Sequence, residues 1–392
     1  MSETTLAATT DMLRRLVAFD TVSTNSNLDL IRWVADYLGS HGIAAHLTYD
    51  EGRSKANLFA TIGPAEAGGG VILSGHTDVV PVAGQPWDRD PFALIERDGR
   101  LYGRGTADMK SFIAIALALV PEFKTRPLRR PLHLALSFDE EVGCFGAPRL
   151  IEALPQGTGR PSLVIVGEPT AMAVANAHKG CHVFATAITG LEAHSSAPQR
   201  GVNAIVAASE IIQCIAGLAG EARHAPRPES GFEPPYTSFN IGTIAGGTAM
   251  NIIPRTCEFT WEFRPLPGDD PAAIRARIDR FIAADLLPRL RQVHPSADVT
   301  TRALASVPGL IAEPGSPAEE LARQLTGANE STVVAYGTEA GLFQNAGIPA
   351  VICGPGSMEQ GHQPNEFITL EQLAAGASFQ RRLADWACRA TP

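Results

Sequence analysis

A short apolar run that ends in a histidine and an aspartate constrains the fold of this chain more than any other feature. The run is Val71–Gly75, and it is followed by His76, Asp78 and Pro81. An apolar run of this length, bounded by glycine and proline, is typical of a buried strand in a parallel sheet. Ligands of open α/β sheets bind beyond the carboxyl ends of the strands. We therefore expect His76 and Asp78, whose side chains point the same way on extended backbone, to lie at a binding site.

Two interpretations of this pair are open when it is taken alone. A neutral imidazole is a good zinc ligand, and a nearby carboxylate can orient it. The simpler interpretation is a histidine and an aspartate that merely close a strand, as in many α/β proteins. The other strand ends of the chain decide between the two.

The same kinds of side chain follow the other predicted strands. A strand over 132–138 runs into three consecutive acids, which require either a solvated loop or a bound cation. An acid follows the apolar run 163–166, another opens the helix expected over 109–120, and a histidine lies in the loop after the strand at 349–353. Separate solvated loops would not place such groups so regularly, so we predict a metal site. Its candidate residues besides His76 are Asp108, Glu140, Glu141, Glu168 and His362.

The glycines at 103 and 105 precede a helix and suggest a dinucleotide-binding turn, an interpretation that we reject. Asp108 stands where the third glycine of that motif is required, and no apolar strand leads directly into Gly103. A carboxylate at the start of a helix gains from the helix dipole. It would repel a phosphate there and attract a metal ion.

Composition excludes several classes of protein. The net charge of −9 argues against a nucleic-acid partner, because phosphate binding requires a basic face. No run approaches the 18 apolar residues of a membrane span, and the N-terminal stretch lacks the features of a signal peptide. The six cysteines form no Cys-x-x-Cys pair, so we expect them to be reduced. These features predict a cytoplasmic protein without membrane contact.

The length of 392 residues and the order of predicted elements indicate two domains. Residues 1–179 and 306–392 are expected to form a discontinuous α/β domain, with a mostly parallel sheet and helices on both faces. Residues 180–305 follow the order βαββαβ of the ferredoxin-like plan, so we expect an inserted α+β domain. Its strands are predicted over 182–189, 238–244, 251–263 and 298–303, and its helices over 203–218 and from 271.

The candidate ligands suit a particular kind of metal site. Two histidines and four or five carboxylates fit two zinc ions that share a bridging carboxylate and a water. Mononuclear sites use fewer ligands, and calcium sites do not favour imidazole. Such a site also requires a glutamate outside the metal ligands to take a proton from the water and pass it to a leaving amine.

At this point the chain resembles the zinc aminoacylase/carboxypeptidase family that includes acetylornithine deacetylase, succinyl-diaminopimelate desuccinylase and carboxypeptidase G2. The resemblance covers nearly the whole length, and no ligand position is missing. The matching motifs are Ser74–Pro81, Gly103–Lys110, Asp139–Gly143, Gly167–Pro169, Ala193–Ala204 and Gly354–His362.

The resemblance implies a role for each candidate residue. One zinc is bound by His76 and Glu168, and Asp108 bridges to a second zinc. Glu141 and His362 complete the second site, so each subunit holds two Zn²⁺, which Co²⁺ or Mn²⁺ can replace. Further implied features are Asp78 as the residue that orients His76, Glu140 as the general acid/base, and a cis peptide bond between Asp108 and Met109.

The resemblance also implies that the inserted domain forms a homodimer. His194 would reach into the site of the partner subunit and stabilise the developing oxyanion. Arg264 and Asn251 would hold the carboxylate of the substrate, since a guanidinium pairs bidentately with carboxylates. Without the resemblance, a loop histidine is the preferred interpretation of His194. For Arg264, a surface arginine is the alternative to substrate binding.

Details of the motifs point to the acetylornithine branch, notably the segments around Lys179 and Glu339. Both residues are candidates for substrate binding, and the acidic Glu339 suits the δ-ammonium of ornithine. The expected activity is the hydrolysis of N2-acetyl-L-ornithine to L-ornithine and acetate, a step of arginine biosynthesis. The alternatives are deacylation or desuccinylation of another N-acyl amino acid, and a dipeptidase or carboxypeptidase with the same metal core. A non-catalytic binding protein is disfavoured because every catalytic position is filled.

Overall fold

The computed structural model describes residues 3–389, which form two compact units. Unit 1 contains the described residues up to Ala177, Leu310–Val333 and those from Thr338 onward, and unit 2 contains His178–Gly309 and Val334–Gly337. We expected the insertion over 180–305, and the short segment 334–337 was not expected as part of it. Met1 and Ser2, which begin the stretch where we expect no signal peptide, lie outside the described residues.

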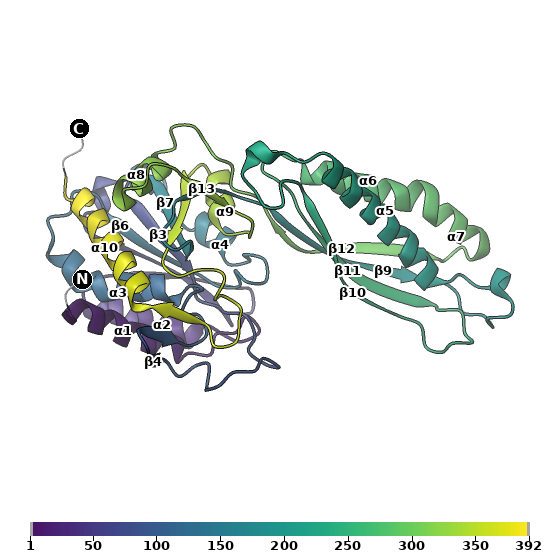
Figure 1. Cartoon of the computed structure of the whole chain (residues 1–392), viewed down its shortest axis with the longest axis horizontal. Helices are drawn as coiled ribbons and strands as arrows, with labels where there is room; N and C mark the ends of the chain where they lie inside the picture. The colour runs from purple at the N-terminus through teal and green to yellow at the C-terminus, as the bar shows by residue number, and fades with distance from the viewer. Residues whose placement is uncertain (1–2, 390–392) are drawn as a thin grey trace. The chain divides into compact units, whose positions relative to one another are not determined.

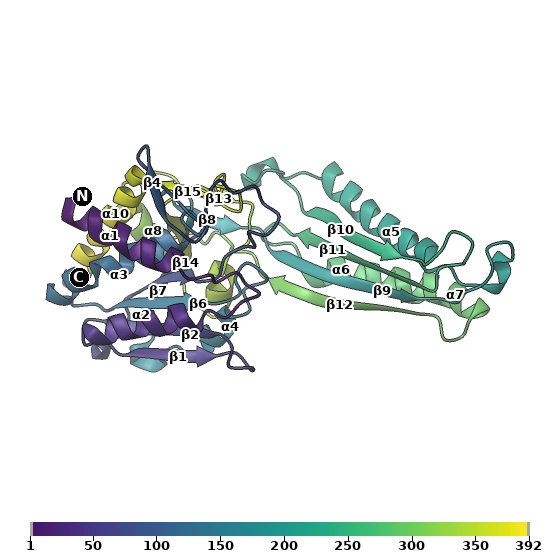
Figure 2. The ribbon, with the colours of Figure 1, turned by 90° about the horizontal axis from the view of Figure 1, so that it is seen from below.

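Unit 1 is built on an eight-stranded sheet whose four central strands are parallel (Figures 1 and 2). In sheet order the strands are β1 (Ala45–Tyr49), β2 (Ala56–Ile62), β6 (Leu132–Ser137), β3 (Val71–His76), β7 (Leu163–Pro169), β14 (Ala350–Gly354), β8 (Ala175–His178) and β13 (Thr332–Val334). Parallel pairing joins β6, β3, β7 and β14, whereas β1 and β2 are antiparallel to their neighbours. The predicted α/β class with a largely parallel sheet is confirmed.

Helices α3 and α9 show that both faces of this sheet are covered. A Cβ on Gly75 in β3 would lie 3.1 Å from the side chain of Ile113 in α3. The preceding Ser74 donates from Oγ to Glu339 Oε2, at the start of α9, over 3.3 Å. Because successive residues of a strand point to opposite faces, α3 and α9 lie on opposite faces of the sheet. The helices of unit 1 are α1 (Glu3–Val17), α2 (Leu28–Ser40), α3 (Lys110–Thr125), α4 (Ala147–Glu152), α8 (Pro317–Thr326), α9 (Ala340–Asn345) and α10 (Leu370–Ala387).

A small sheet of three short strands completes the regular structure of unit 1. It consists of β15 (Phe367–Thr369), β5 (Arg100–Tyr102) and β4 (Ile95–Arg97), in that order. Strands β4 and β5 form a hairpin whose turn residues, Asp98 and Gly99, both have positive φ. A two-residue turn of this kind matches the twist of the paired strands.

Unit 2 has the ferredoxin-like plan that the order of elements predicts. Its antiparallel sheet has the order β10 (Ser238–Gly246), β11 (Thr256–Arg264), β9 (Cys181–Thr189) and β12 (Asp298–Val307). The helices are α5 (Ala204–His224), α6 (Pro271–Arg280) and α7 (Leu287–Val293), the last two joined by a π-helical segment over Phe281–Leu286. In the sequence order of its strands the sheet therefore runs 2-3-1-4, the βαββαβ arrangement.

Helix α5 is long and apolar because it covers the sheet of unit 2. Its buried residues share a core with aromatic side chains of β9 and β11, among them Phe184, Phe259 and Trp261. By length and composition alone, α5 is the one candidate for a membrane span among the described residues. Its packing within this core accounts for the same apolar composition.

Strand β11 begins five residues later than predicted. We expected a strand from Asn251, but over residues 251–255 only Ile252 is paired, in an isolated antiparallel bridge with His194, and regular pairing starts at Thr256. Pro254 explains the difference, since proline cannot donate to a strand ladder. Strand β8 was also not predicted, because four residues carry too little periodicity to indicate an element.

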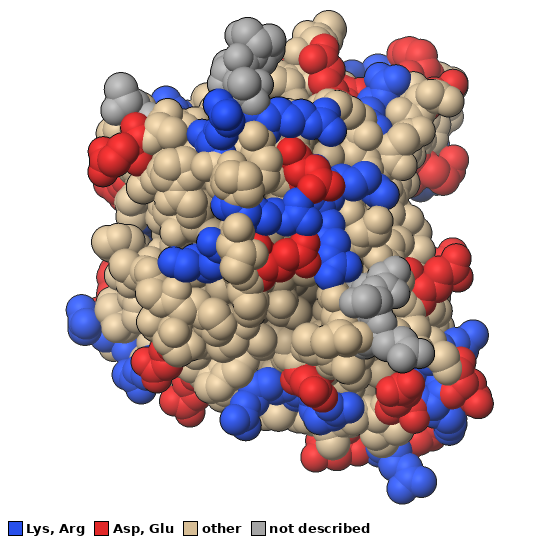
Figure 3. All heavy atoms as spheres, turned by 90° about the vertical axis from the view of Figure 1, so that its left-hand side faces the viewer, with Lys and Arg blue, Asp and Glu red and all other residues tan. Residues whose placement is uncertain are grey.

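The face of the molecule shown in Figure 3 carries basic and acidic side chains interspersed with one another. Several charged groups of unit 1 are paired across helices: Arg126, which follows α3, pairs with Asp385 of α10, and Arg381 of α10 pairs with Glu122 of α3. All six cysteines lie within the described residues and none of them is in a disulfide; three are buried and three half-buried.

Candidate metal and catalytic site

The five predicted ligands converge beyond one edge of the central sheet. His76 ends β3, Glu141 follows β6 and Glu168 lies in β7. Asp108 comes just before α3, and His362 lies in the loop after β14. Their ligand atoms form two groups suited to a metal ion, in each of which the atoms lie within 4.8 Å of one another: His76, Asp108 and Glu168 in the first, and Asp108, Glu141 and His362 in the second.

The two carboxylate oxygens of Asp108 are divided between the two groups. Oδ1 lies 2.9 Å from Nε2 of His76, and Oδ2 lies 3.2 Å from Nε2 of His362. His76 Nε2 is also 3.7 Å from Glu168 Oε1, and His362 Nε2 is 2.9 Å from Glu141 Oε2. A carboxylate with one oxygen facing each histidine has the geometry of a shared ligand.

Burial and mutual repulsion shift the protonation of this cluster. Burial raises the pKa of the Glu168 carboxyl well above its usual range, and the nearby Asp108 raises it further. Burial together with Asp108 likewise raises the pKa of Glu141 to about 7. Hydrogen bonds to Asp108 and Glu141 raise the pKa of His362 to about 10. Burial would lower the pKa of His76, but Glu168, Asp108 and Glu140 outweigh it and raise the pKa instead. A cluster that holds extra protons in this way favours a cation in their place.

Two further observations indicate that these residues suit a metal ion. Oε1 of Glu141 and Oε1 of Glu168 are buried and have no hydrogen-bond partner. Buried carboxylate oxygens without partners are unfavourable unless a cation satisfies them. Two imidazoles with carboxylates also form a donor set that suits zinc and similar transition metals rather than calcium.

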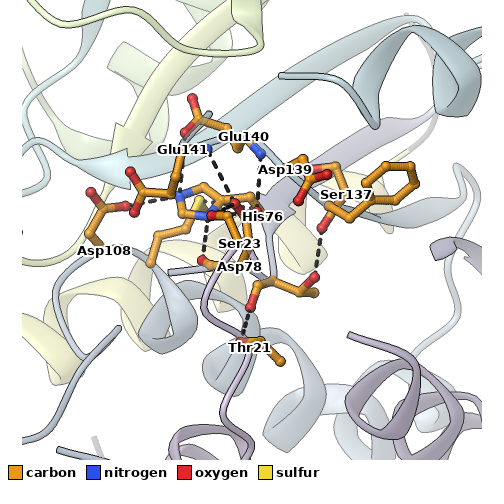
Figure 4. A network of polar contacts seen from close by, with 12 residues as sticks. Thr21, Ser23, His76, Asp78, Asp108, Ser137, Asp139, Glu140 and Glu141 are labelled. Carbon is orange, nitrogen blue, oxygen red and sulfur yellow. Dashed lines mark hydrogen bonds and ion pairs between the residues drawn. The ribbon is translucent and has the colours of Figure 1, made fainter. Parts of the chain in front are cut away.

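The Asp78 carboxylate organises the backbone around the site (Figure 4). It accepts hydrogen bonds from the N–H of Glu140 at 3.1 Å, the N–H of Glu141 at 3.3 Å and the hydroxyl of Ser23 at 2.7 Å. His76 Nδ1 lies 2.9 Å from the backbone carbonyl of Asp78 and 3.7 Å from its carboxylate. In this structure the orienting contact to His76 therefore comes from the Asp78 backbone, while its side chain fixes the 140–141 turn.

Glu140 lies beside both ligand groups and belongs to neither. Its Oε2 is 4.0 Å from His76 Nε2, and its side chain keeps 11% of its surface exposed. Burial raises the pKa of Glu140 well above its usual range; His76 opposes this shift, and Glu141 and Asp108 add to it. The thiol of Cys144 donates to Glu140 Oε1 over 3.5 Å. A raised pKa suits a carboxyl that accepts a proton in one step of a reaction and donates it in the next.

The peptide bond between Asp108 and Met109 is cis, which confirms the expectation drawn from the resemblance.

Glu339, a predicted substrate contact, belongs to unit 1 and is 1% exposed. Its carboxylate accepts the Ser74 hydroxyl, and burial raises its pKa. The Glu339 side chain therefore contacts β3 at Ser74, two residues before the candidate ligand His76.

The other predicted substrate residues lie in unit 2, at two separate places. The backbone of Asn251 accepts the N–H of Ser195 at 3.0 Å, so Asn251 lies beside His194, and both side chains are exposed. Arg264 and Lys179 lie at the other end of β11, where the Gly180 N–H donates to the Pro265 carbonyl at 3.1 Å. Eight residue steps separate Thr256 from Arg264, which corresponds to about 26 Å of strand. One copy of unit 2 therefore cannot bring Asn251 and Arg264 to the same small carboxylate.

Lys179 and Arg264 each have partners within unit 2. The Lys179 ammonium donates to the backbone carbonyls of Pro234 at 2.7 Å and Tyr236 at 2.9 Å, and the residue is 1% exposed. Arg264 pairs with Glu262 at 3.2 Å and is about one-third exposed. Arg264 is accordingly the more accessible of the two to a substrate.

Sequence reasoning missed several residues that support the ligands. Glu366 accepts backbone hydrogen bonds from the segment that carries Asp108, Arg104 pairs with Glu366, and Ser23 binds Asp78. The available signal was an acid in a glycine- and proline-rich loop, four residues after His362. Nothing in the sequence indicates that Ser23 reaches Asp78, because 55 residues separate the two.

Together, an α/β unit that gathers two histidines and several buried acids at its strand ends, and an inserted ferredoxin-like unit, define a metal-dependent hydrolase. A family model described as peptidase family M20/M25/M40 matches residues 72–386. The chain belongs to this family of hydrolases. It is 37% identical over 380 residues, with 94% of each chain covered, to an acetylornithine deacetylase of Myxococcus xanthus.

Solved structures share the fold at lower identity. A metallo-carboxypeptidase of this family from Sulfolobus solfataricus matches with a TM-score of 0.76 and 17% identity, covering 99% of this chain and 100% of the other. A Bacillus subtilis protein described as a dinuclear metal-binding peptidase of the same family matches with a TM-score of 0.64 and 19% identity, covering 98% of each chain. At these identities the likeness bears on the fold alone.

Proposed function

We propose that this protein removes the acyl group from an N-acyl amino acid, and that its substrate is N2-acetyl-L-ornithine. The similarity to an acetylornithine deacetylase, which extends over 94% of both chains, carries this proposal. The products would be L-ornithine and acetate, and the reaction would belong to arginine biosynthesis. The geometry of the site supports the chemistry, since it provides metal ligands and a separate proton acceptor.

Two metal ions would be held by the ligand groups described above. His76 and Glu168 would bind one ion, Glu141 and His362 the other, and Asp108 both. The donor set favours Zn²⁺, with Co²⁺ or Mn²⁺ as substitutes. When bound, such ions polarise the amide carbonyl and lower the pKa of water.

Glu140 would act as the general acid/base. It would accept a proton from the attacking water as the C–O bond forms, and donate it to the amide nitrogen as the C–N bond breaks. Asp78 would hold Glu140 in place through its backbone N–H at 3.1 Å. An amide and a water give a carboxylic acid and an amine, so the proton that Glu140 takes from the water is the one that the leaving nitrogen requires. The carboxylic acid then loses its own proton, and the final products are acetate and an ammonium group.

His194 would supply a hydrogen bond to the developing oxyanion of the partner subunit. The backbone N–H of Ser196 donates to His194 Nδ1 at 3.2 Å, which leaves Nε2 as the donor of the neutral imidazole. The separation of Asn251 from Arg264 fits the same arrangement: His194 and Asn251 would come from one subunit and Arg264 from the other. Lys179 and Glu339 would shape the substrate pocket, with Glu339 favouring a substrate ammonium.

A homodimer through unit 2 would bring these residues together. Strand β10 is an edge of its sheet, with unpaired backbone groups available to a second copy. Large apolar side chains are exposed on α5, on β10 and in the segment after β10, namely Ile205, Val206, Ile244, Met250 and Ile252. Exposed apolar side chains beside a free strand edge favour self-association. The described residues contain six cysteines and no disulfide, which fits the reducing conditions of the cytoplasm, where we place the protein.

Initial rates on a panel of substrates test the proposal. The panel contains N-acetylornithine, N-acetylmethionine, succinyl-diaminopimelate, acyl-glutamates and unmodified dipeptides. We expect the highest kcat/KM for N-acetylornithine. A tenfold or greater preference for another acyl amino acid would reject this substrate while leaving the deacylase class intact, whereas equal turnover of plain dipeptides would support a peptidase.

A further inference from the structure

Glu366 is a buried carboxylate in unit 1 that the reaction outlined above does not use. It follows the ligand His362 by four residues and is 1% exposed. Both of its oxygens are occupied by the segment that ends in the ligand Asp108. The donors are the N–H groups of Ala107 at 2.7 Å and Asp108 at 3.0 Å to Oε1, and the N–H of Gly105 at 3.1 Å and Nη1 of Arg104 at 2.7 Å to Oε2.

A second chain of contacts leads from this pair to His362. The Arg104 guanidinium also donates from Nη2 to Oε1 of Gln85 at 2.5 Å. Gln85 in turn donates from Nε2 to the backbone carbonyl of His362 at 2.9 Å. Arg104 is 1% exposed, so it is held in this position. The network therefore joins the backbones of two metal ligands, Asp108 and His362.

Glu366 is the residue at this place that no neutral side chain can replace. Three backbone N–H groups and one guanidinium converge on it, and buried N–H groups require acceptors. A glutamine would offer one acceptor oxygen and would turn its own NH₂ toward a donor. The negative charge also balances the buried Arg104.

We propose that Glu366, acting through Arg104 and Gln85, is a positioning residue that sets the distance between Asp108 and His362. It thereby determines the affinity of the metal ion held by Asp108, Glu141 and His362. This inference rests on the proposed function, since it takes those three residues to be ligands. Partners behind a metal ligand typically contribute 10- to 100-fold to metal affinity.

Zinc titration of the metal-free protein against a chelating indicator tests the inference, with dissociation constants resolved for both ions. Glu366→Gln should weaken zinc binding about 10- to 100-fold. Gln85→Ala removes only the link to His362, and Gln85 is half-buried, so this variant serves if Glu366→Gln does not fold. Gln85→Ala should raise the dissociation constant of one of the two zinc ions about tenfold.

A second background separates positioning from general loosening of the fold. Glu141→Gln removes a ligand of the site that contains His362 and leaves the His76–Asp108–Glu168 site. Adding Gln85→Ala to it should leave the dissociation constant of the remaining zinc unchanged. If Gln85 had a purely structural role, its replacement would weaken the binding of that zinc as well. This result would overturn the inference.

Matched controls are available in unit 1. Gln324→Ala changes an exposed glutamine of α8, and Glu122→Gln breaks the pairs with Arg126 and Arg381. Both should bind zinc as the wild type does. If the wild type binds two zinc ions and the dissociation constants are unchanged in Glu366→Gln and Gln85→Ala, the inference is overturned and the proposed function is not. Fewer than two zinc ions in the wild type overturn the proposed function and the inference with it.

Discussion

Glu140 is the residue whose replacement tests the chemistry most sharply. The substitution Glu140→Gln keeps the size of the side chain and removes its ability to accept a proton. Oε2 of Glu140 lies 4.0 Å from His76 Nε2, and the residue belongs to neither ligand group, so both metals should stay. The backbone N–H of Glu140, which binds Asp78, is unaffected. Loss of a general base typically costs 10²- to 10⁴-fold in rate, or about 3–5 kcal/mol of transition-state stabilisation.

Steady-state kinetics with N-acetylornithine, combined with elemental analysis of the same samples, measure both effects. We expect kcat and kcat/KM to fall together, because the lost interaction forms in the transition state. Glu141→Gln is the matched control: it should lose metal as well as activity. A Glu140→Gln protein that keeps more than a tenth of wild-type kcat refutes the assignment, and one that loses zinc means that the roles of Glu140 and Glu141 are exchanged.

Three further predictions concern the partner subunit, the dimer and the protons of the site. A mixture of His194→Ala and Glu140→Ala proteins should regain about a quarter of wild-type activity, because half of randomly mixed dimers are heterodimers with one complete site; no recovery with subunit exchange confirmed would reject the cross-subunit role. Ile244→Glu on β10 should give an inactive monomer in light scattering, whereas Val293→Glu, at another exposed apolar position in unit 2, should leave the dimer intact. Zinc must displace protons, because Glu141 with a pKa of about 7 and His362 with a pKa of about 10 hold them at neutral pH without metal. Zinc affinity should therefore rise from pH 6 to pH 8, with net proton release in calorimetry in two buffers; zinc binding without proton release would contradict these shifts.

The convergence of the candidate ligands could be predicted from the sequence because each follows a strongly apolar strand or opens a helix. His76 and Glu168 stand at the ends of buried parallel strands, and such ends meet at one edge of a sheet. That His76 and Glu168 lie close together could therefore be predicted without information on packing. The order of elements similarly predicts the ferredoxin-like unit.

Contacts between distant segments could not be predicted in this way. Arg104 and Glu366 are 262 residues apart, and their pairing depends on how two loops pack. The contacts of the Asp78 carboxylate with the 140–141 turn could not be predicted either, because 62 residues separate Asp78 from Glu140. The start of β11 was misplaced because the apolar Ile252 and Ile253 extend the strand pattern, whereas Pro254 separates them from the regular pairing that begins at Thr256.

The zinc content of variants at the candidate ligands tests whether Asp108 holds both metal ions. Wild-type protein and the variants Asp108→Asn, Glu168→Gln and Glu141→Gln are saturated with zinc, passed over a desalting column and analysed for zinc and protein. If Asp108 serves both ions, the wild type should retain two zinc ions per chain, Glu168→Gln and Glu141→Gln one each, and Asp108→Asn fewer than either of them. An Asp108→Asn protein that retains two zinc ions would show that Asp108 does not bridge them.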